Sequence, residues 1–144
     1  MRRVPRRRAS RDAPVYQIRT RDILVRVVAS YAPEQSDPEE AEYLWIYTVE
    51  IENHGRQTVQ LVSRRWVVTD SQNRVEESSG EGVAGEQPEL KPGEAFRYSQ
   101  TSALKTPSGS MRGVYQMVTD TGEEFEAQIP EFSLHLPGAG RVVN

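Results

Sequence analysis

From residue 43 the chain reads Tyr43-Leu44-Trp45-Ile46-Tyr47-Thr48-Val49-Glu50-Ile51. Aromatic and β-branched side chains stand at every second position, while Thr48 and Glu50 occupy the positions between the later ones. This alternation is typical of a β-strand that buries one face and exposes the other. The stretch therefore predicts a strand at the centre of a β-sheet.

The same period of two residues recurs along the chain. Residues 23–31 alternate in the same way, and residues 59–69 form a third apolar run whose phase slips near Ser63-Arg64, which predicts a β-bulge. Further strands are predicted over residues 95–101, 110–119 and 125–136, with Pro130 breaking the last one. Six to eight short strands separated by turns indicate an all-β sandwich or barrel.

The run Leu90-Lys91-Pro92-Gly93-Glu94 favours the sandwich. Pro92-Gly93 suits a tight turn that leads into a strand, and Leu90 is placed to close the end of the core. This arrangement recurs in immunoglobulin-like and fibronectin-type-III-like antiparallel sandwiches, in which Trp66 would fill the place of the core tryptophan. The only helical signal is a single turn near residues 37–41.

The chain has 144 residues and no cysteine, which fits one domain without disulfides or thiolate metal sites. No apolar run approaches the roughly 20 residues of a membrane helix, so we expect no membrane span, and the lack of cysteine favours a reducing compartment. Residues 1–11 hold six arginines and no acid, whereas the remainder holds 12 basic and 21 acidic residues, a net charge of −9. The acidic body would repel phosphate backbones, so we expect it to bind no nucleic acid.

Three segments follow from these patterns: a disordered arginine-rich arm (1–14), a β-sandwich domain (15–137) and a flexible tail (138–144). A solvated arm is the preferred interpretation of residues 1–14. An arm that binds nucleic acid or a membrane surface, or a mitochondrial presequence, are the alternatives.

Gly80, Gly82 and Gly85 form a literal G-x-G-x-x-G pattern. The pattern holds a pyrophosphate when a helix begins directly after it, because the helix N-terminus supplies amide donors. Here Glu86-Gln87-Pro88 follows and no helix is predicted. We therefore interpret the run as a glycine-rich turn within a loop that spans residues 80–93.

Four acidic residues surround the glycines: Glu76, Glu77, Glu81 and Glu86. Their spacing matches no cation-binding loop, and the two histidines lie far apart in the sequence, so no metal site and no cofactor are predicted. No catalytic arrangement is supported either, which predicts a protein that is not an enzyme. The acids of the 76–90 loop are instead candidate contacts to a protein partner.

Several motifs resemble those of the ApaG family. The most specific is the run 80–88 with its Glu-Gln-Pro end, followed by residues 90–94. The others are the stretches 36–40 and 47–49, 60–66, 106–111 and 129–132, so that the resemblance covers residues 16–137.

The resemblance implies a fibronectin-type-III-like sandwich of the bacterial cytoplasm, associated with cobalt and magnesium efflux without being the transporter. Similar modules in eukaryotic F-box adaptors and in a polymerase-associated protein imply a protein-binding role. The family's glycine motif, at Gly80, Gly82 and Gly85 here, has been proposed as a pyrophosphate site. Two hypotheses stay open: a non-enzymatic module with an unknown protein partner, or a protein that responds to a divalent cation or nucleotide bound at the glycine run.

Overall fold

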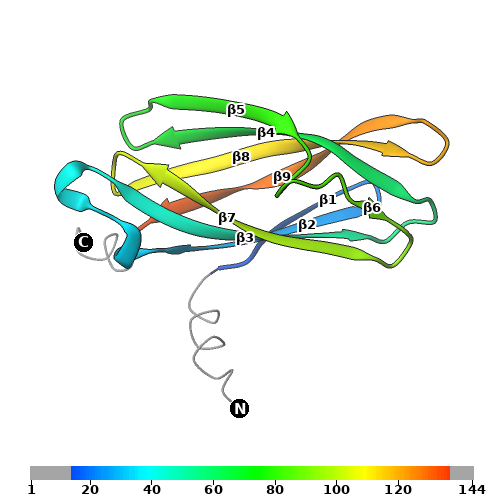
Figure 1. Ribbon diagram of the computed structural model, residues 1–144, viewed down its shortest axis with the longest axis horizontal. Helices are drawn as coiled ribbons and strands as arrows, with labels where there is room; N and C mark the ends of the chain where they lie inside the picture. Colours follow the sequence, from blue (N-terminus) through cyan, green and yellow to red (C-terminus); the bar gives the residue numbers. More distant parts are fainter. Residues whose placement is uncertain (1–13, 137–144) are drawn as a thin grey trace, which may run out of the picture.

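The protein folds into two antiparallel sheets packed face to face, as the computed structural model of residues 14–136 shows (Figure 1). The first sheet has the order β1-β2-β3-β7, formed by Tyr16–Thr20, Ile23–Tyr31, Tyr43–Asn53 and Ala95–Leu104. The second sheet has the order β5-β4-β8-β9, formed by Val75–Glu81, Val59–Asp70, Ser108–Thr119 and Glu124–His135, and the short β6 (Glu89–Leu90) pairs with β4. The all-β sandwich predicted from the alternation is thereby confirmed.

The core lies between the sheets and is built from the inward-facing residue of each alternating pair. Trp45, Tyr115 and Phe132 are among its largest fully buried side chains. Trp66 is 4% exposed, and its ring centroid lies 5.2 Å from that of Tyr47 and 6.1 Å from that of Phe132. The predicted core position of Trp66 is confirmed.

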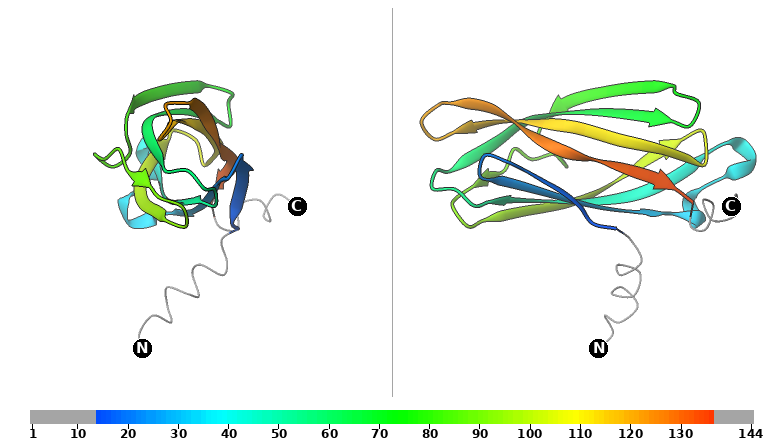
Figure 2. Two further views of the ribbon diagram at one scale, coloured as in Figure 1. Left: turned by 90° about the vertical axis from the view of Figure 1, so that its right-hand side faces the viewer. Right: turned by 180° about the vertical axis from the view of Figure 1, so that it is seen from behind.

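One side of the sandwich is closed where β1 lies beside β9. The backbone N–H of Gln128 in β9 donates to the Thr20 hydroxyl of β1 at 3.0 Å, and the rings of Tyr16 and Phe132 lie 6.0 Å apart. The other edge strands, β5 and β7, face the opposite side, where no strand joins the two sheets within the described residues (Figure 2). The sandwich thus has a closed side and an open side.

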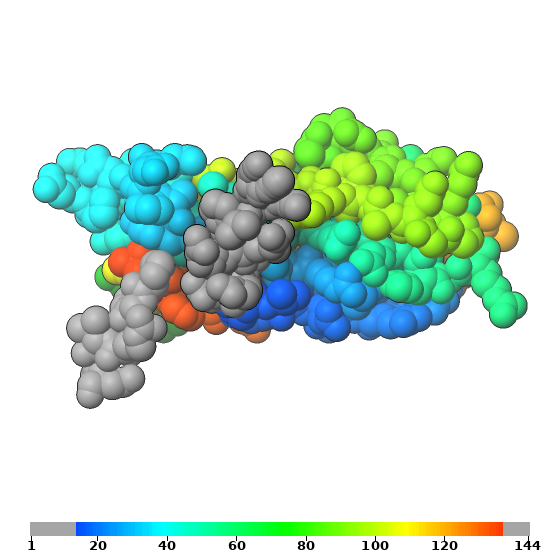
Figure 3. Space-filling model, turned by 90° about the horizontal axis from the view of Figure 1, so that it is seen from below, coloured from blue at the N-terminus to red at the C-terminus, as the bar shows by residue number. Residues whose placement is uncertain are grey.

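Two short 3-10 turns, η1 (Pro33–Gln35) and η2 (Pro38–Glu40), connect β2 to β3. Proline begins each of them, as expected for a residue whose fixed φ suits the first turn of a helix. The turn predicted over residues 37–41 corresponds to η2. In the space-filling view of the first sheet, this segment stands out at one end of the molecule (Figure 3).

A β-bulge explains the phase slip of the third predicted strand. The register between β4 and β8 shifts between Leu61 and Ser63. Leu61 is buried before the shift and Trp66 after it, so odd positions face the core on one side of the bulge and even positions on the other. The predicted bulge is confirmed.

Two sequence-based expectations are wrong. Residues 80–93 are not one loop, because β5 continues to Glu81 and β6 forms at Glu89–Leu90. Pro130 does not break the last strand: β9 runs through it where the β8–β9 register shifts, and a shifted ladder tolerates a residue without an N–H. The sequence also gave no sign of β1, whose residues are mostly exposed and alternate weakly.

The predicted arm, apart from Pro14, and the whole predicted tail (138–144) lie outside the described residues. Within residues 14–136, no helix is long and apolar enough to cross a membrane.

Candidate functional site

The glycine run forms a tight hairpin between β5 and β6. The backbone N–H groups of Val83 and Glu86 each donate to the other's carbonyl at 2.8 Å, which leaves Ala84 and Gly85 as the two turn residues. Both turn residues have positive φ, 49° and 79°, as the mirror-image turns favoured in two-residue hairpins require. Val83 is 1% exposed, so the hairpin inserts an apolar side chain into the core.

Gly80 and Gly82 are small for different reasons. Gly82 has a φ of +66°, and a Cβ there would lie 2.2 Å from the Glu86 carbonyl oxygen. Gly80 pairs with Arg64 across the β4–β5 ladder, and a Cβ there would lie 2.9 Å from the guanidinium. Gly82 therefore makes room for backbone, whereas Gly80 makes room for the Arg64 side chain.

The Arg64 side chain anchors the glycine run through two hydrogen bonds to its backbone. Its guanidinium donates to the carbonyl oxygens of Glu81 at 3.1 Å and Gly82 at 2.9 Å. The Gly82 amide donates to the Val62 carbonyl at 2.8 Å, so the amides of Gly82, Val83 and Glu86 are all used within the protein. The chain that follows enters a strand instead of a helix, which leaves a pyrophosphate without the usual cluster of amide donors.

The four candidate acids do not form one cluster. Glu76, Glu77 and Glu81 lie on β5, where neighbouring side chains point to opposite faces, and Glu86 lies at the hairpin. Glu76 pairs with Val68 and lines the open side, while Glu81 lies beside Arg65 on the other face of the sheet. No group of three potential metal ligands is present among residues 14–136.

A groove lies on the open side of the sandwich, and of the sequence-predicted site residues only Glu76 lines it. Its volume is about 640 Å³, and it lies between the edges of the two sheets beside η2. Its lining comes from four segments of the chain: Glu40, Ala41, Glu42 and Leu44; Val68 and Asp70; Arg74 and Glu76; and Ala103, Leu104 and Lys105. No local motif could reveal it, because its residues meet only through the pairing of distant strands.

Three tyrosine side chains, those of Tyr47, Tyr98 and Tyr115, are buried between the sheets. The hydroxyls of Tyr98 and Tyr115 share a hydrogen bond, and the Tyr47 hydroxyl lies 3.5 Å from the Gln100 side chain. Burial raises the pKa of Tyr115 well above 10 and also raises the pKa values of Tyr98 and Tyr47. All three side chains are therefore neutral at pH 7 and serve as hydrogen-bonding members of the core.

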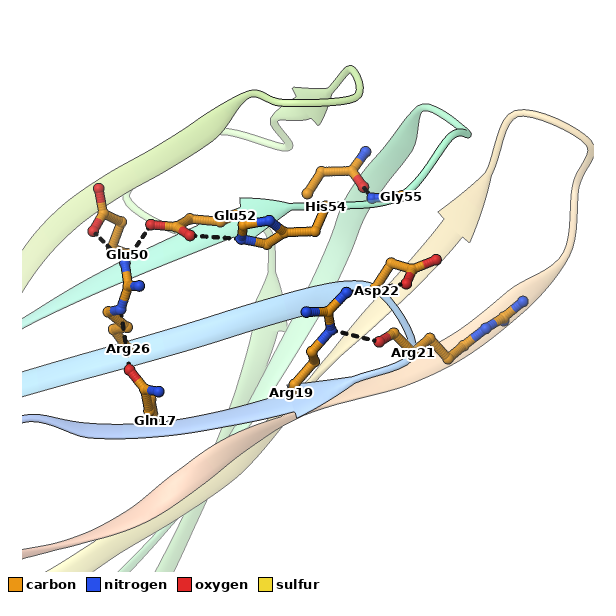
Figure 4. A network of polar contacts seen from close by, with 10 residues as sticks. Gln17, Arg19, Arg21, Asp22, Arg26, Glu50, Glu52, His54 and Gly55 are labelled. Carbon is orange, nitrogen blue, oxygen red and sulfur yellow. Dashed lines mark hydrogen bonds and ion pairs between the residues drawn. The ribbon is translucent and has the colours of Figure 1, made fainter.

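A polar network covers the outer face of the first sheet (Figure 4). Arg26 pairs with Glu50 at 3.6 Å and with Glu52, while His54 Nε2 lies 2.8 Å from a Glu52 oxygen. The hydrogen bond from His54, together with the Arg26 charge, lowers the pKa of Glu52. These residues bridge β2 and β3 on the solvent side, a cross-strand arrangement that stabilises a sheet.

The fold and this site define a fibronectin-type-III-like sandwich with one open side. A family model described as the ApaG domain matches residues 33–119. The protein ApaG of Caulobacter vibrioides is 63% identical over 139 residues, covering 96% of this chain and 99% of the relative. The protein ApaG of Methylocella silvestris is 52% identical over 130 residues, covering 90% and 100%.

Solved structures agree with this assignment. The crystal structure of an ApaA protein from Bordetella pertussis is 47% identical, covers 81% of this chain and 94% of that one, and superposes with a TM-score of 0.79. The C-terminal domain of wzt, 8% identical with a TM-score of 0.51 over 85% of this chain, shares the fold alone. The chain belongs to the ApaG domain family.

Proposed function

We propose that the chain is a non-enzymatic protein-interaction module of the ApaG type, acting in the cytoplasm, whose partner binds the open side of the sandwich. The observation that carries the proposal is a pair of strand edges on one side of the molecule, those of β5 and β7, which pair with no further strand within residues 14–136. Unpaired edges present free N–H and C=O groups and are a common means of recognising an extended segment of another protein.

The β7 edge is the better suited of the two. It is ten residues long, contains no proline, and carries Arg97 as its only charged residue. Edges that must stay unpaired usually carry several charges, a proline or a bulge, and β5 does carry three glutamates. Since β7 lacks these devices, a partner segment can approach it closely.

The alternative of a cation or nucleotide bound at the glycine run has no specific observation in its favour. The amides that would hold a phosphate are engaged in the hairpin, and the acids lie on different faces. The glycines have a sufficient structural reason in the turn itself.

In-cell photo-crosslinking tests the proposal. A photoreactive residue replaces Thr101 on β7 or Ser79 on β5, and a matched control replaces Ser133 on β9, all three being exposed positions. The expected result is one protein captured from Thr101 or Ser79 and absent from Ser133. Capture of nothing, or equal capture from all three positions, would contradict an interaction through the open side.

An association with cobalt and magnesium efflux would arise through such a partner. Cells that lack the gene should then lose cobalt tolerance, and the chain with a blocked open side should fail to restore it. Unchanged tolerance in the deletion strain would remove the metal-transport part of the proposal and leave the interaction part standing.

A further inference from the structure

The groove on the open side combines an apolar floor with an acidic rim. Leu104 is 4% exposed and, with the half-buried Leu44 and Val68, forms the floor. Of the acidic residues around it, Asp70 is already paired with Arg74 at 2.7 Å. Glu40, Glu42 and Glu76 make no ion pair with any described residue, and the one remaining cation of the rim is Lys105. The groove is therefore net negative.

The rim is held in shape by backbone hydrogen bonds. The amides of Glu40 and Glu42 both donate to the Asp37 carbonyl at 3.0 Å, and the Asp37 amide donates to the Glu42 carbonyl at 2.7 Å. Ala41, between the two glutamates, adopts a left-handed φ of 57°. A rim fixed in this way keeps its two carboxylates pointing from a defined loop, which reduces the entropy lost on binding.

We infer that the groove binds an extended segment of a partner protein that carries arginine or lysine between apolar residues. The apolar side chains would cover Leu44, Val68 and Leu104, and the cation would meet the carboxylates of the rim. Charge complementarity selects this occupant over an acidic or neutral peptide. The inference rests on the proposed function and names the chemistry of the partner segment.

The location supports an extended occupant. The groove lies next to the end of β7, where the backbone edge is unpaired, and next to Arg74 and Glu76 at the start of β5. A strand added to that edge would place alternate side chains toward the groove, because successive residues of a strand point to opposite faces.

The experiment titrates the full-length ¹⁵N-labelled chain with a capped hexapeptide of alternating leucine and arginine, and with the same peptide containing glutamate for arginine. The basic peptide should shift the amide resonances of Leu44, Glu76 and Leu104, and the acidic peptide should not. The variant Glu40→Gln/Glu42→Gln/Glu76→Gln should bind the basic peptide about tenfold more weakly. The control Glu124→Gln/Glu126→Gln/Glu131→Gln, with the same net charge on exposed β9 positions, should bind it like the wild type.

Three outcomes would overturn the inference: shifts confined to other surfaces, equal weakening in the control variant, or equal binding of the acidic peptide. The chain's own basic segment is tested by replacing its six arginines with glutamine in the full-length protein (Arg2, Arg3, Arg6, Arg7, Arg8 and Arg11). Movement of the groove resonances in that variant without any peptide would identify an internal occupant and would also overturn the inference. If a partner is captured in cells but the basic peptide does not shift the groove resonances, this inference alone is refuted, and the proposed protein-interaction function is retained.

Discussion

Gly82→Ala tests whether the glycine run is demanded by the fold. Gly82 has a φ of +66°, and the added Cβ would lie 2.2 Å from the Glu86 carbonyl oxygen. Gly85 is the natural control, because its φ of +79° is equally left-handed while no atom lies within 4 Å of its added Cβ. The two substitutions separate backbone strain from steric conflict.

The expected losses of stability follow from backbone strain and steric conflict. A left-handed conformation costs an alanine about 1–2 kcal/mol, which is the whole expected effect of Gly85→Ala. Gly82→Ala adds an overpacking term of about 1–3 kcal/mol, because the Glu86 carbonyl is backbone held by the hairpin and cannot swing aside. The total expected loss for Gly82→Ala, about 2–5 kcal/mol, is a large part of the roughly 5–15 kcal/mol by which a typical domain is stable against unfolding. Ala84→Gly should act in the opposite direction and stabilise by about 0.5–1 kcal/mol, since Ala84 already adopts a positive φ of 49°.

Urea unfolding at 25 °C, followed by circular dichroism and tryptophan fluorescence, measures all three variants against the wild type. The expected order of stability is Ala84→Gly, wild type, Gly85→Ala and Gly82→Ala. Equal costs for Gly82→Ala and Gly85→Ala, or a destabilised Ala84→Gly, would refute the hairpin argument. The glycines would then need an explanation outside the fold, such as a ligand.

Three further predictions concern the core, the tyrosines and the arm. Trp66→Ala should cost about 3–5 kcal/mol, and a thermal midpoint lowered by only a few degrees would contradict its burial. Stability should fall as pH rises above about 10, because the unfolded chain releases tyrosine protons that burial makes the folded chain retain, at up to about 1.4 kcal/mol per pH unit for each tyrosine. Tyr98→Phe should flatten this dependence in unfolding curves recorded between pH 8 and 11.5, and an unaltered slope would contradict the assignment. Deletion of residues 1–13 should leave the thermal midpoint unchanged, since the described strands begin at Tyr16, and a large drop would show that the segment contributes to the fold.

The strands with strict alternation could be predicted from the sequence because the sandwich buries one face of each. β3 is the clearest example: its buried and half-buried residues alternate from Trp45 to Asn53. Even the bulge in β4 could be predicted, because the alternation of apolar residues changes phase at that point in the sequence. The ApaG domain match confirms the family that the motifs suggested.

The sequence suggests at most a short strand over residues 74–77, so the full length of β5 and the groove could not be predicted from local pattern. β5 is almost wholly exposed and contains serine, glycine and glutamate, residues of low strand propensity, so it forms through its pairing with β4. The position of Arg64 beneath Gly80 likewise depends on that pairing. Glu76 and Glu81 are close in sequence, but strand alternation sends their side chains to different faces, which sequence distance alone does not reveal.

The open edge of the second sheet is held from its two ends. At one end Asp70 and Arg74 pair across the β4–β5 turn, and at the other Arg64 binds the carbonyls of Glu81 and Gly82. Between these anchors β4 is the one strand of residues 14–136 that pairs with β5, so the position of β5 is fixed while no other described strand covers its outer edge. A fixed β5 keeps Glu76 in place at the rim of the groove, so a segment added to the β7 edge would meet a carboxylate that is already positioned, which lowers the cost of association. The anchor at Arg64 also explains why the glycine run must fold tightly, because a looser turn would move the carbonyls of Glu81 and Gly82 away from the guanidinium and remove this anchor.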